Sequence, residues 1–260
     1  MTKVKSRDCF SSDANLINRL ITDAIDDLIS RNSLRGAEKK AKRKNKRNVG
    51  RLPMLVKLSI EEFSRVLGSN APAPSGGSVA ALSGALGADL VSMVCRLSIG
   101  RKEYEQFDST LTECLEKSVA LSGGLLRRID LDTEAFNGVM AAFKLPKETD
   151  EDKKARTAAI QSGYKEAVQS PLGIAKECRD VLHLTHKLIG KSNSNALSDL
   201  GVASQQAFAG LEGAIMNVEI NIPSIKDEDF KSKTSSQISA LLEEGRKLKD
   251  NVYKYVSENI

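Results

Sequence analysis

The chain has 260 residues, of which 40% are apolar, and this is enough for one sizeable hydrophobic core. Aromatic residues make up only 4% and tryptophan is absent, so the core must consist of aliphatic and small side chains, as in closely packed helices. The net charge of +5 comes from one segment, since nine lysines and arginines and a single glutamate lie between Arg35 and Arg51, and this excludes a folded body that is basic throughout.

The N-terminal part is expected to hold two segments outside the main domain. Residues 1–31 contain an amphipathic helix, in which Ile17, Leu20, Ile21, Ala24, Ile25 and Leu28 form one apolar stripe. Residues 32–57 form a basic, flexible linker, because they have little apolar surface to bury. This linker has no aromatic side chains to stack on bases, so nucleic-acid binding is not favoured.

The four cysteines are scattered along the chain and none belongs to a CxxC pair, which argues against a structural zinc site. Met1–Asp27 has neither the apolar region of a secretory signal nor the composition of a transit peptide. We therefore expect reduced thiols and a cytoplasmic location.

Residues 58–260 are predicted to form one helical domain. Its first helix follows Ser59, and Glu62 three residues later completes a capping-box pattern. The sequence NAPAPSGGSVAALSGALGADLVSMVCRLSIG then runs from Asn70 to Gly100. The prolines predict an extended approach, and Ser75 or Ser78 is expected to cap a long helix.

Small residues recur at a spacing of four on this central helix, as in Ala80, Gly84, Ala88 and Ser92. Close packing against another helix is the favoured interpretation, because glycine inside a helix is unfavourable unless something needs a flat face. A compatible alternative is that the glycine-rich start presents free backbone N–H groups to an anionic or planar ligand. The apolar run is about long enough for a membrane span, but Asp89 and the small residues favour a buried helix, and no membrane contact is expected.

Further helices are predicted over 104–129, from Asp132 to Phe143, over 155–190 with a break at Pro171 as one alternative, over 198–220 and over 231–260. The helix over 198–220 is again rich in glycine and alanine. No run of alternating β-branched residues predicts a strand. The expected fold is all-α, an antiparallel helical bundle with long small-residue-rich helices.

Five stretches of the sequence, in order, resemble the family of formiminotetrahydrofolate cyclodeaminases and methenyltetrahydrofolate cyclohydrolases. They are Asn70–Ala81, Asp132–Phe136, Leu145–Lys147, Asn193–Val202 and Asn217–Asn221, the last followed by Ile225–Asp227. The resemblance covers about Leu58 to Ile260, and it leaves the first 57 residues unexplained.

The resemblance implies a homodimer of helical bundles that acts on the carbon bridging N5 and N10 of tetrahydrofolate. The substrate would be a folate, with or without a polyglutamate tail. Cyclodeamination would release ammonia from a formimino group, whereas cyclohydrolysis would add water to a methenyl group, and both remain open. An alternative is a catalytically inactive helical interaction module of the same fold, whose basic N-terminal segment binds an anionic partner.

Carboxylates and amides at predicted helix starts are the candidates for chemistry under this resemblance, because both reactions need a proton shuttle at the bridging carbon. Asp132 is the first choice. The catalytic candidates are Asp132, Glu134 and Asp199. The substrate-binding candidates are Ser75, Gly76, Gly77, Asn137, Lys144, Asn193 and Asn195.

The only histidines, His183 and His186, are three residues apart and could face one metal ion. No third ligand follows at a suitable spacing, so ordinary half-buried or surface histidines are the favoured interpretation. Neither reaction requires a metal or a redox cofactor, and we expect none.

Overall fold

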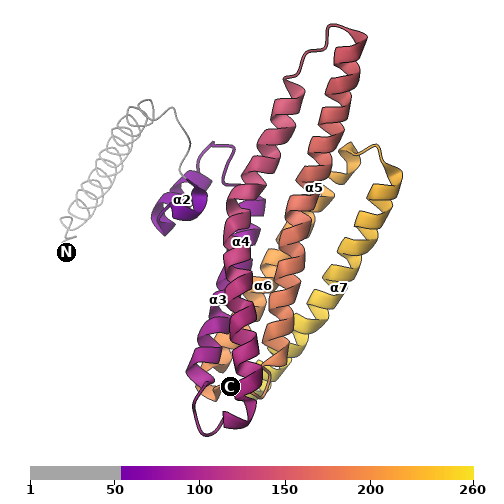
Figure 1. The fold of residues 1–260 in the computed structure, drawn as a ribbon. Coiled ribbons are helices and arrows are strands. Elements are labelled where there is room, and N and C mark those ends of the chain that lie inside the picture. The colour runs from indigo at the N-terminus through magenta and orange to yellow at the C-terminus, as the bar shows by residue number, and fades with distance from the viewer. Residues whose placement is uncertain (1–53) are drawn as a thin grey trace, which may run out of the picture. The chain divides into compact units, whose positions relative to one another are not determined.

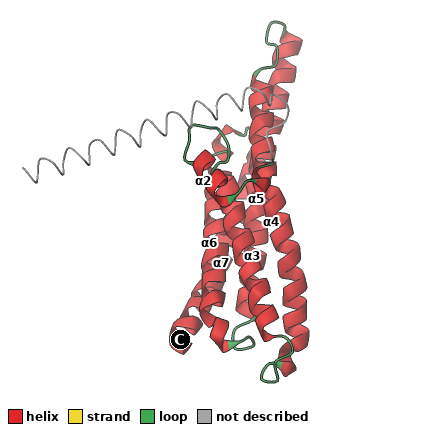
Figure 2. Ribbon diagram, turned by 90° about the vertical axis from the view of Figure 1, so that its left-hand side faces the viewer, coloured by secondary structure: helices red, strands yellow, loops and turns green. Residues whose placement is uncertain are grey.

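The structure of the protein, a computed structural model, describes residues 54–260. Every regular element in this range is a helix (Figure 2), so the all-α fold class is confirmed. The helices are η1 (Leu55–Lys57), α2 (Ile60–Leu67), α3 (Gly76–Ser98), η2 (Glu105–Phe107), α4 (Asp108–Phe143), α5 (Asp150–Lys187), η3 (Ser194–Ala196), α6 (Leu197–Glu219), η4 (Ile222–Ser224) and α7 (Glu228–Asn259). The helix predicted over 1–31 and most of the predicted linker lie outside the described residues.

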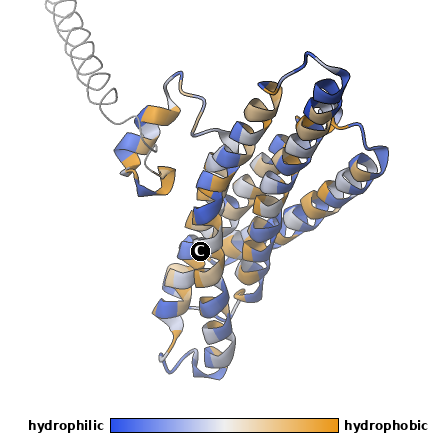
Figure 3. Cartoon of the chain, turned by 45° about the horizontal axis from the view of Figure 1, so that its top comes forward, coloured by the Kyte–Doolittle hydropathy of each residue, from blue (hydrophilic) through white to orange (hydrophobic). Residues whose placement is uncertain are grey.

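Helices α3, α4, α5 and α6 form the bundle, and α7 packs against α5 and α6. Consecutive long helices run in opposite directions and are joined by short turns (Figure 1), as the sequence predicts. The largest fully buried side chains are leucines, isoleucines and valines, which fits the aliphatic core expected from the composition. The upper parts of α4 and α5 extend beyond the other helices of the bundle as a hairpin with a strongly hydrophilic tip (Figure 3).

The two small-residue helices α3 and α6 press against each other, as their glycine and alanine patterns predict. A Cβ atom added to Gly210 would lie 2.7 Å from the Ala80 carbonyl oxygen and 3.0 Å from the Gly84 backbone nitrogen. A Cβ atom added to Gly87 would lie 2.9 Å from the Ala203 carbonyl oxygen. Because these neighbours are backbone atoms, the two helices could accommodate a methyl group there only by moving apart.

Two alanine substitutions one turn apart on α6 test this packing. We expect Gly210→Ala to lower the free energy of unfolding by about 1–3 kcal/mol, because the new methyl group overpacks the contact. Gly213→Ala should be neutral or stabilising by up to about 1 kcal/mol, since its Cβ atom would meet only the Ala80 Cβ atom at 3.5 Å, an ordinary contact. Urea unfolding of both variants would measure the difference, and equal stabilities would contradict the close α3–α6 contact.

Helix α3 is the only helix among the described residues that is long and apolar enough to cross a membrane by length and composition. In the structure it is a central helix of the bundle, and 61% of its most apolar window is buried against other helices. The low polarity of α3 is therefore explained by its burial among the other helices of the bundle.

The predicted helix break near Asp130 is wrong, since α4 runs without interruption from Asp108 to Phe143. The acidic residues there serve other segments instead of beginning a new helix. Asp130 accepts hydrogen bonds from the backbone N–H groups of Leu55, at 2.6 Å, and Val56, at 3.4 Å, and this fixes η1 to α4. An aspartate that binds a distant segment cannot be told from one that caps its own helix by its sequence neighbours alone. The predicted helix start near Asp132 was misplaced for this reason.

The alternative of a break at Pro171 is not realised either, because α5 continues through this residue from Asp150 to Lys187. Thr149 and Asp152 form a capping box at its start. A second capping box, between Ser59 and Glu62, begins α2 as predicted.

Candidate functional site

The N-terminus of α3 is held against the middle of α4. Ser75 is the N-cap residue of α3 by its backbone angles, but its side chain accepts no capping hydrogen bond from the helix. Its hydroxyl group donates instead to the Asp132 carboxylate, with 2.9 Å between Oγ and Oδ2. One turn further, the buried Ser78 hydroxyl donates to the Ile129 carbonyl oxygen at 3.0 Å. The carboxylate of a neighbouring helix thus lies where the capping side chain of α3 would normally be.

Gly77 makes room for this carboxylate. A Cβ atom added to Gly77 would lie 2.5 Å from the Asp132 Cγ atom, which is far closer than two carbon atoms can approach. Glycine at this position therefore lets the Asp132 side chain lie directly on the first turn of α3. The predicted group of Ser75, Gly76, Gly77 and Asp132 comes together in the structure as one cluster.

The electrostatics of Asp132 result from two opposing effects. Burial raises the pKa of Asp132, because the charged carboxylate loses water. Hydrogen bonds from the Ser75 hydroxyl and the Ser78 backbone lower the pKa, and burial is the larger effect. Asp132 therefore holds its proton to a higher pH than an ordinary aspartate, as expected of a group that exchanges protons with a ligand.

A cavity of about 360 Å³ opens beside Asp132, between the α3 N-terminus, α4, α5 and the C-terminal end of α6. One wall is apolar and aromatic, with the Phe143 and Tyr164 rings edge to face at a centroid distance of 6.2 Å. This wall is formed by Pro72, Phe136, Val139, Met140, Phe143 and Tyr164. A flat ring could lie against it while its polar edge reaches Asp132.

Two asparagines also line the cavity, Asn217 in the last turn of α6 and Asn221 just after that helix. The Asn217 Nδ2 atom donates to the Gly213 carbonyl oxygen, and the Asn221 Nδ2 atom donates to the Asn217 carbonyl oxygen, both at 2.8 Å. Because carbonyl oxygens only accept, these bonds fix which atom of each amide is nitrogen. Each Oδ1 atom then remains as an acceptor with no donor among residues 54–260.

Asn217 and Asn221 were missing from the predicted site residues. The available signal was their place in a stretch that resembles the family, together with their spacing of four on one helix face. The sequence could not show that the C-terminal end of α6 lies beside the start of α3.

No lysine or arginine of the described chain lines this cavity. Cationic groups lie nearby, at the base of the hydrophilic hairpin tip. The Arg156 guanidinium lies 5.6 Å from the centroid of the Phe143 ring and donates to the Phe143 carbonyl oxygen at 3.2 Å. Lys144 follows Phe143 and is exposed. An anionic tail of a bound ligand would meet these groups outside the cavity.

Three other predicted residues on α4 lie outside this cavity. Glu134 is exposed and lines a separate groove of about 760 Å³ between α4 and α5. Asn137 and Lys144 are also exposed and line neither space. Glu134 and Asn137 belong to α4 and Lys144 follows its last residue, but none of the three lines the cavity beside Asp132.

The remaining predicted residues, Asn193, Asn195 and Asp199, lie at the other end of α3. The buried Asn193 side chain donates to the Leu97 carbonyl oxygen at 3.1 Å and accepts from the Asn195 backbone N–H at 3.0 Å, so its amide holds the turn before α6. Asn195 is exposed and Asp199 is half-buried. Since α3 has 23 residues at about 1.5 Å each, roughly 33 Å separates this group from Asp132 within one chain.

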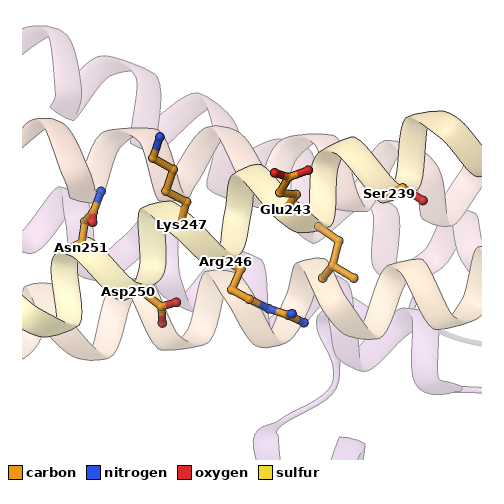
Figure 4. Close-up of a pocket in the computed structure, with 7 residues that line it drawn as sticks. Ser239, Glu243, Arg246, Lys247, Asp250 and Asn251 are labelled. Atoms are coloured by element: carbon orange, nitrogen blue, oxygen red, sulfur yellow. The ribbon is translucent and has the colours of Figure 1, made fainter.

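Two further depressions of the protein surface are less suited to hold a ligand than the cavity beside Asp132. One of about 530 Å³ is lined by residues of α7 alone (Figure 4), so it has no opposing wall. Another, of about 510 Å³, lies between α4 and α5 and includes His183, whose Nε2 atom is 2.8 Å from Glu244. In residues 54–260, no three metal-binding side chains form a cluster.

Comparisons with known proteins identify the family of the chain. The sequence pattern described as formiminotransferase-cyclodeaminase matches residues 59–240. The methenyltetrahydrofolate cyclohydrolase of Methylorubrum extorquens is 43% identical over 202 residues, which are 78% of this chain and 97% of that protein. The formimidoyltransferase-cyclodeaminase of Rattus norvegicus is 39% identical over 192 residues, which are 74% of this chain but only 36% of that protein.

A solved structure has the same fold. The formiminotetrahydrofolate cyclodeaminase of Thermotoga maritima superimposes with a TM-score of 0.71 and 26% sequence identity. The superposition covers 78% of this chain and 97% of the other. The chain thus spans nearly all of the Methylorubrum and Thermotoga proteins and about a third of the longer formimidoyltransferase-cyclodeaminase of Rattus norvegicus.

Proposed function

Because the chain belongs to the formiminotransferase-cyclodeaminase family, we propose that it is a folate one-carbon enzyme acting at the carbon that bridges N5 and N10 of tetrahydrofolate. The observation that carries the proposal is the half-buried Asp132 carboxyl group of α4, which lies against the start of α3 and lines a cavity with an aromatic wall. 5,10-Methenyltetrahydrofolate is the species shared by both candidate reactions. It is the product of cyclodeamination and the substrate of cyclohydrolysis.

In cyclohydrolysis, the Asp132 carboxylate takes a proton from water as the water oxygen bonds to the methenyl carbon. The resulting tetrahedral carbon carries a hydroxyl group and two ring nitrogens. Asp132 then gives this proton to one nitrogen as its bond to carbon breaks, the hydroxyl group releases its own proton to water, and the resulting formyl group is left on the other nitrogen. The negative charge of Asp132 also matches the positive charge of the methenyl group, and no lysine or arginine of residues 54–260 lines the cavity to oppose it.

In cyclodeamination, the same carboxyl group handles two protons in sequence. N10 attacks the formimino carbon and passes its proton to Asp132, and the formimino nitrogen receives a proton and leaves as ammonia. In either reaction the Ser75 hydroxyl orients the carboxylate through its 2.9 Å hydrogen bond. Carboxyl chemistry of this kind needs no metal ion or redox cofactor.

The direct test follows the absorbance of 5,10-methenyltetrahydrofolate with the purified full-length chain. Loss of absorbance from added methenyl compound would identify cyclohydrolase activity. A gain from 5-formiminotetrahydrofolate, with release of ammonia, would identify cyclodeaminase activity. If neither occurs and no folate binds, the enzyme proposal fails, and the helical interaction module becomes the better explanation.

The proposal includes a homodimer formed through the outer face of α3 and α6. Leu86, Leu90, Met93 and Leu97 recur at helical spacing on α3, and Leu86 is 47% exposed. On α6, Met216 is 60% exposed and Ile220 is 77% exposed. Exposed apolar side chains on two neighbouring helices fit a two-fold contact with a second copy.

A two-fold axis perpendicular to α3 would make the α3 helices of the two copies antiparallel. The end of one chain that carries Asn195 and Asp199 would then approach the Asp132 cavity of the other chain. This arrangement would reunite the two groups of predicted site residues that are separated by roughly 33 Å within one chain.

Leu86→Glu tests the dimer, because a charge within an apolar contact would have to lose its water. We expect sedimentation velocity to show a halved mass for this variant at micromolar concentration, with turnover reduced if the partner completes the site. Val119→Glu on the outer side of α4 is the matched control, since Val119 is 48% exposed, and it should leave the mass unchanged. A monomeric unaltered chain would remove the dimer from the proposal but not the enzyme.

A further inference from the structure

Pro171 leaves one backbone carbonyl of α5 without its usual donor. In an α-helix, the N–H group of each residue donates to the carbonyl oxygen four residues earlier. Proline has no N–H group, so the Ala167 carbonyl lacks this bond although α5 continues through both residues. Ala167 and Pro171 both line the 360 Å³ cavity beside Asp132.

Only a weak contact from a neighbouring side chain replaces the missing donor. The Asn221 Nδ2 atom lies 3.5 Å from the Ala167 carbonyl oxygen, at the limit of a hydrogen bond, and makes its shorter bond, 2.8 Å, to the Asn217 carbonyl oxygen. Without a strong donor within the helix, the Ala167 oxygen is more available to accept from a ligand than an ordinary helix carbonyl.

Three neutral acceptors therefore belong to neighbouring residues that line the cavity. They are the Ala167 carbonyl oxygen and the Oδ1 atoms of Asn217 and Asn221, and together they define an acceptor wall. No lysine or arginine of residues 54–260 lines the space. A wall of acceptors without cations favours a ligand edge that carries several N–H groups.

We propose that the acceptor wall binds the N–H-bearing edge of the pterin ring, and that Pro171 is a positioning residue that keeps the Ala167 carbonyl available. The inference rests on the proposed folate substrate and adds the orientation of the ring. The amino and ring N–H groups of the pterin donate toward α5 and α6. The bridging carbon then lies on the side of Asp132, where the proton transfers occur.

Pro171→Ala tests the inference, because alanine restores an N–H group that donates to the Ala167 carbonyl within the helix. The variant should melt at a higher temperature, since proline is the least favourable residue in a helix interior. It should also bind 5-formyltetrahydrofolate, a stable folate, about threefold to tenfold more weakly, the range expected for one lost hydrogen bond. In turnover assays KM should rise more than kcat falls, because the carbonyl acts on binding. Calorimetry would measure both melting and folate binding.

Gly138→Ala is the matched control for added helix stability. A Cβ atom on Gly138 would meet no atom within 4 Å, and this residue lies on α4 outside the cavity. This variant should melt at a higher temperature and bind 5-formyltetrahydrofolate like the unaltered chain.

Two results would overturn the inference while the proposed function stands. One is unchanged folate affinity in Pro171→Ala when the unaltered chain is active. The other is a lower melting temperature of that variant, which would show that Pro171 serves the fold. If the unaltered chain neither binds nor converts any tetrahydrofolate, the proposed function fails and the inference fails with it.

Discussion

Replacing Asp132 with asparagine is expected to slow turnover of the folate substrate by about 10²-fold to 10⁴-fold, the loss typical of a missing general acid and base. Asparagine has nearly the same shape and can still accept the Ser75 hydrogen bond, so the start of α3 should keep its geometry. The loss should appear in kcat, with the affinity for 5-formyltetrahydrofolate changed much less. Full activity of Asp132→Asn would assign the proton transfers to another group.

The same substitution has an expected effect on stability. Because burial raises the pKa of Asp132 in the folded protein, the folded state holds the proton more tightly than the unfolded chain does. The contribution of this group to stability is therefore fully present below the ordinary aspartate pKa of about 3.9 and is lost as the pH rises through the folded-state pKa. At neutral pH, Asp132→Asn should melt at the same or a higher temperature than the unaltered protein.

A pH–rate profile of the unaltered chain would connect these two effects. The acidic limb of kcat/KM should lie above the pH at which an ordinary aspartate titrates, because the free enzyme needs Asp132 ionised to take the first proton. This limb should disappear in Asp132→Asn. A limb that persists in the variant would belong to a different group.

Gly77→Ala is expected to have the second large effect, although it adds only one methyl group. Its Cβ atom would lie 2.5 Å from the Asp132 Cγ atom, so the carboxyl group must move away from the start of α3. A displacement of about 1 Å at a catalytic group can reduce turnover by about 10²-fold. Steady-state kinetics with the methenyl substrate would measure the loss.

Gly76→Ala is the neighbouring comparison for this prediction. Its Cβ atom would lie 3.4 Å from the nearest atom, the Asn217 Nδ2, so only a small adjustment is required. We expect a much smaller loss of turnover than for Gly77→Ala. Equal losses in the two variants would mean that the helix start as a whole, and not the Gly77–Asp132 contact, controls activity.

Several features could be predicted from the sequence because they depend on local composition and periodicity. The absence of strand patterns and the scarcity of aromatic residues predicted an all-α bundle with an aliphatic core. Glycine and alanine at a spacing of four on two helices predicted the close contact that Gly84 and Gly210 make. The five ordered stretches indicated the family, and within them Ser75, Gly77 and Asp132 were chosen as candidates that do lie together.

Other features depended on which segments meet in space. Asp130 and Asp132 lie within an unbroken α4, and their carboxylates bind η1 and the start of α3. Local sequence cannot distinguish a side chain that caps its own helix from one that binds another segment. Asn193 matched the family stretches equally well, yet its amide holds a turn at the far end of α3.

The sequence by itself determined the class of fold and the family, because composition, helical periodicity and five short ordered stretches are properties of residues close together along the chain. Only the tertiary structure decided that Asp132 lies beside the start of α3 and that the middle of α5 and the C-terminal end of α6 complete the cavity. A backbone carbonyl carries no signature of its own in a sequence, and its availability depends on a proline four residues later and on the helix that packs beside it.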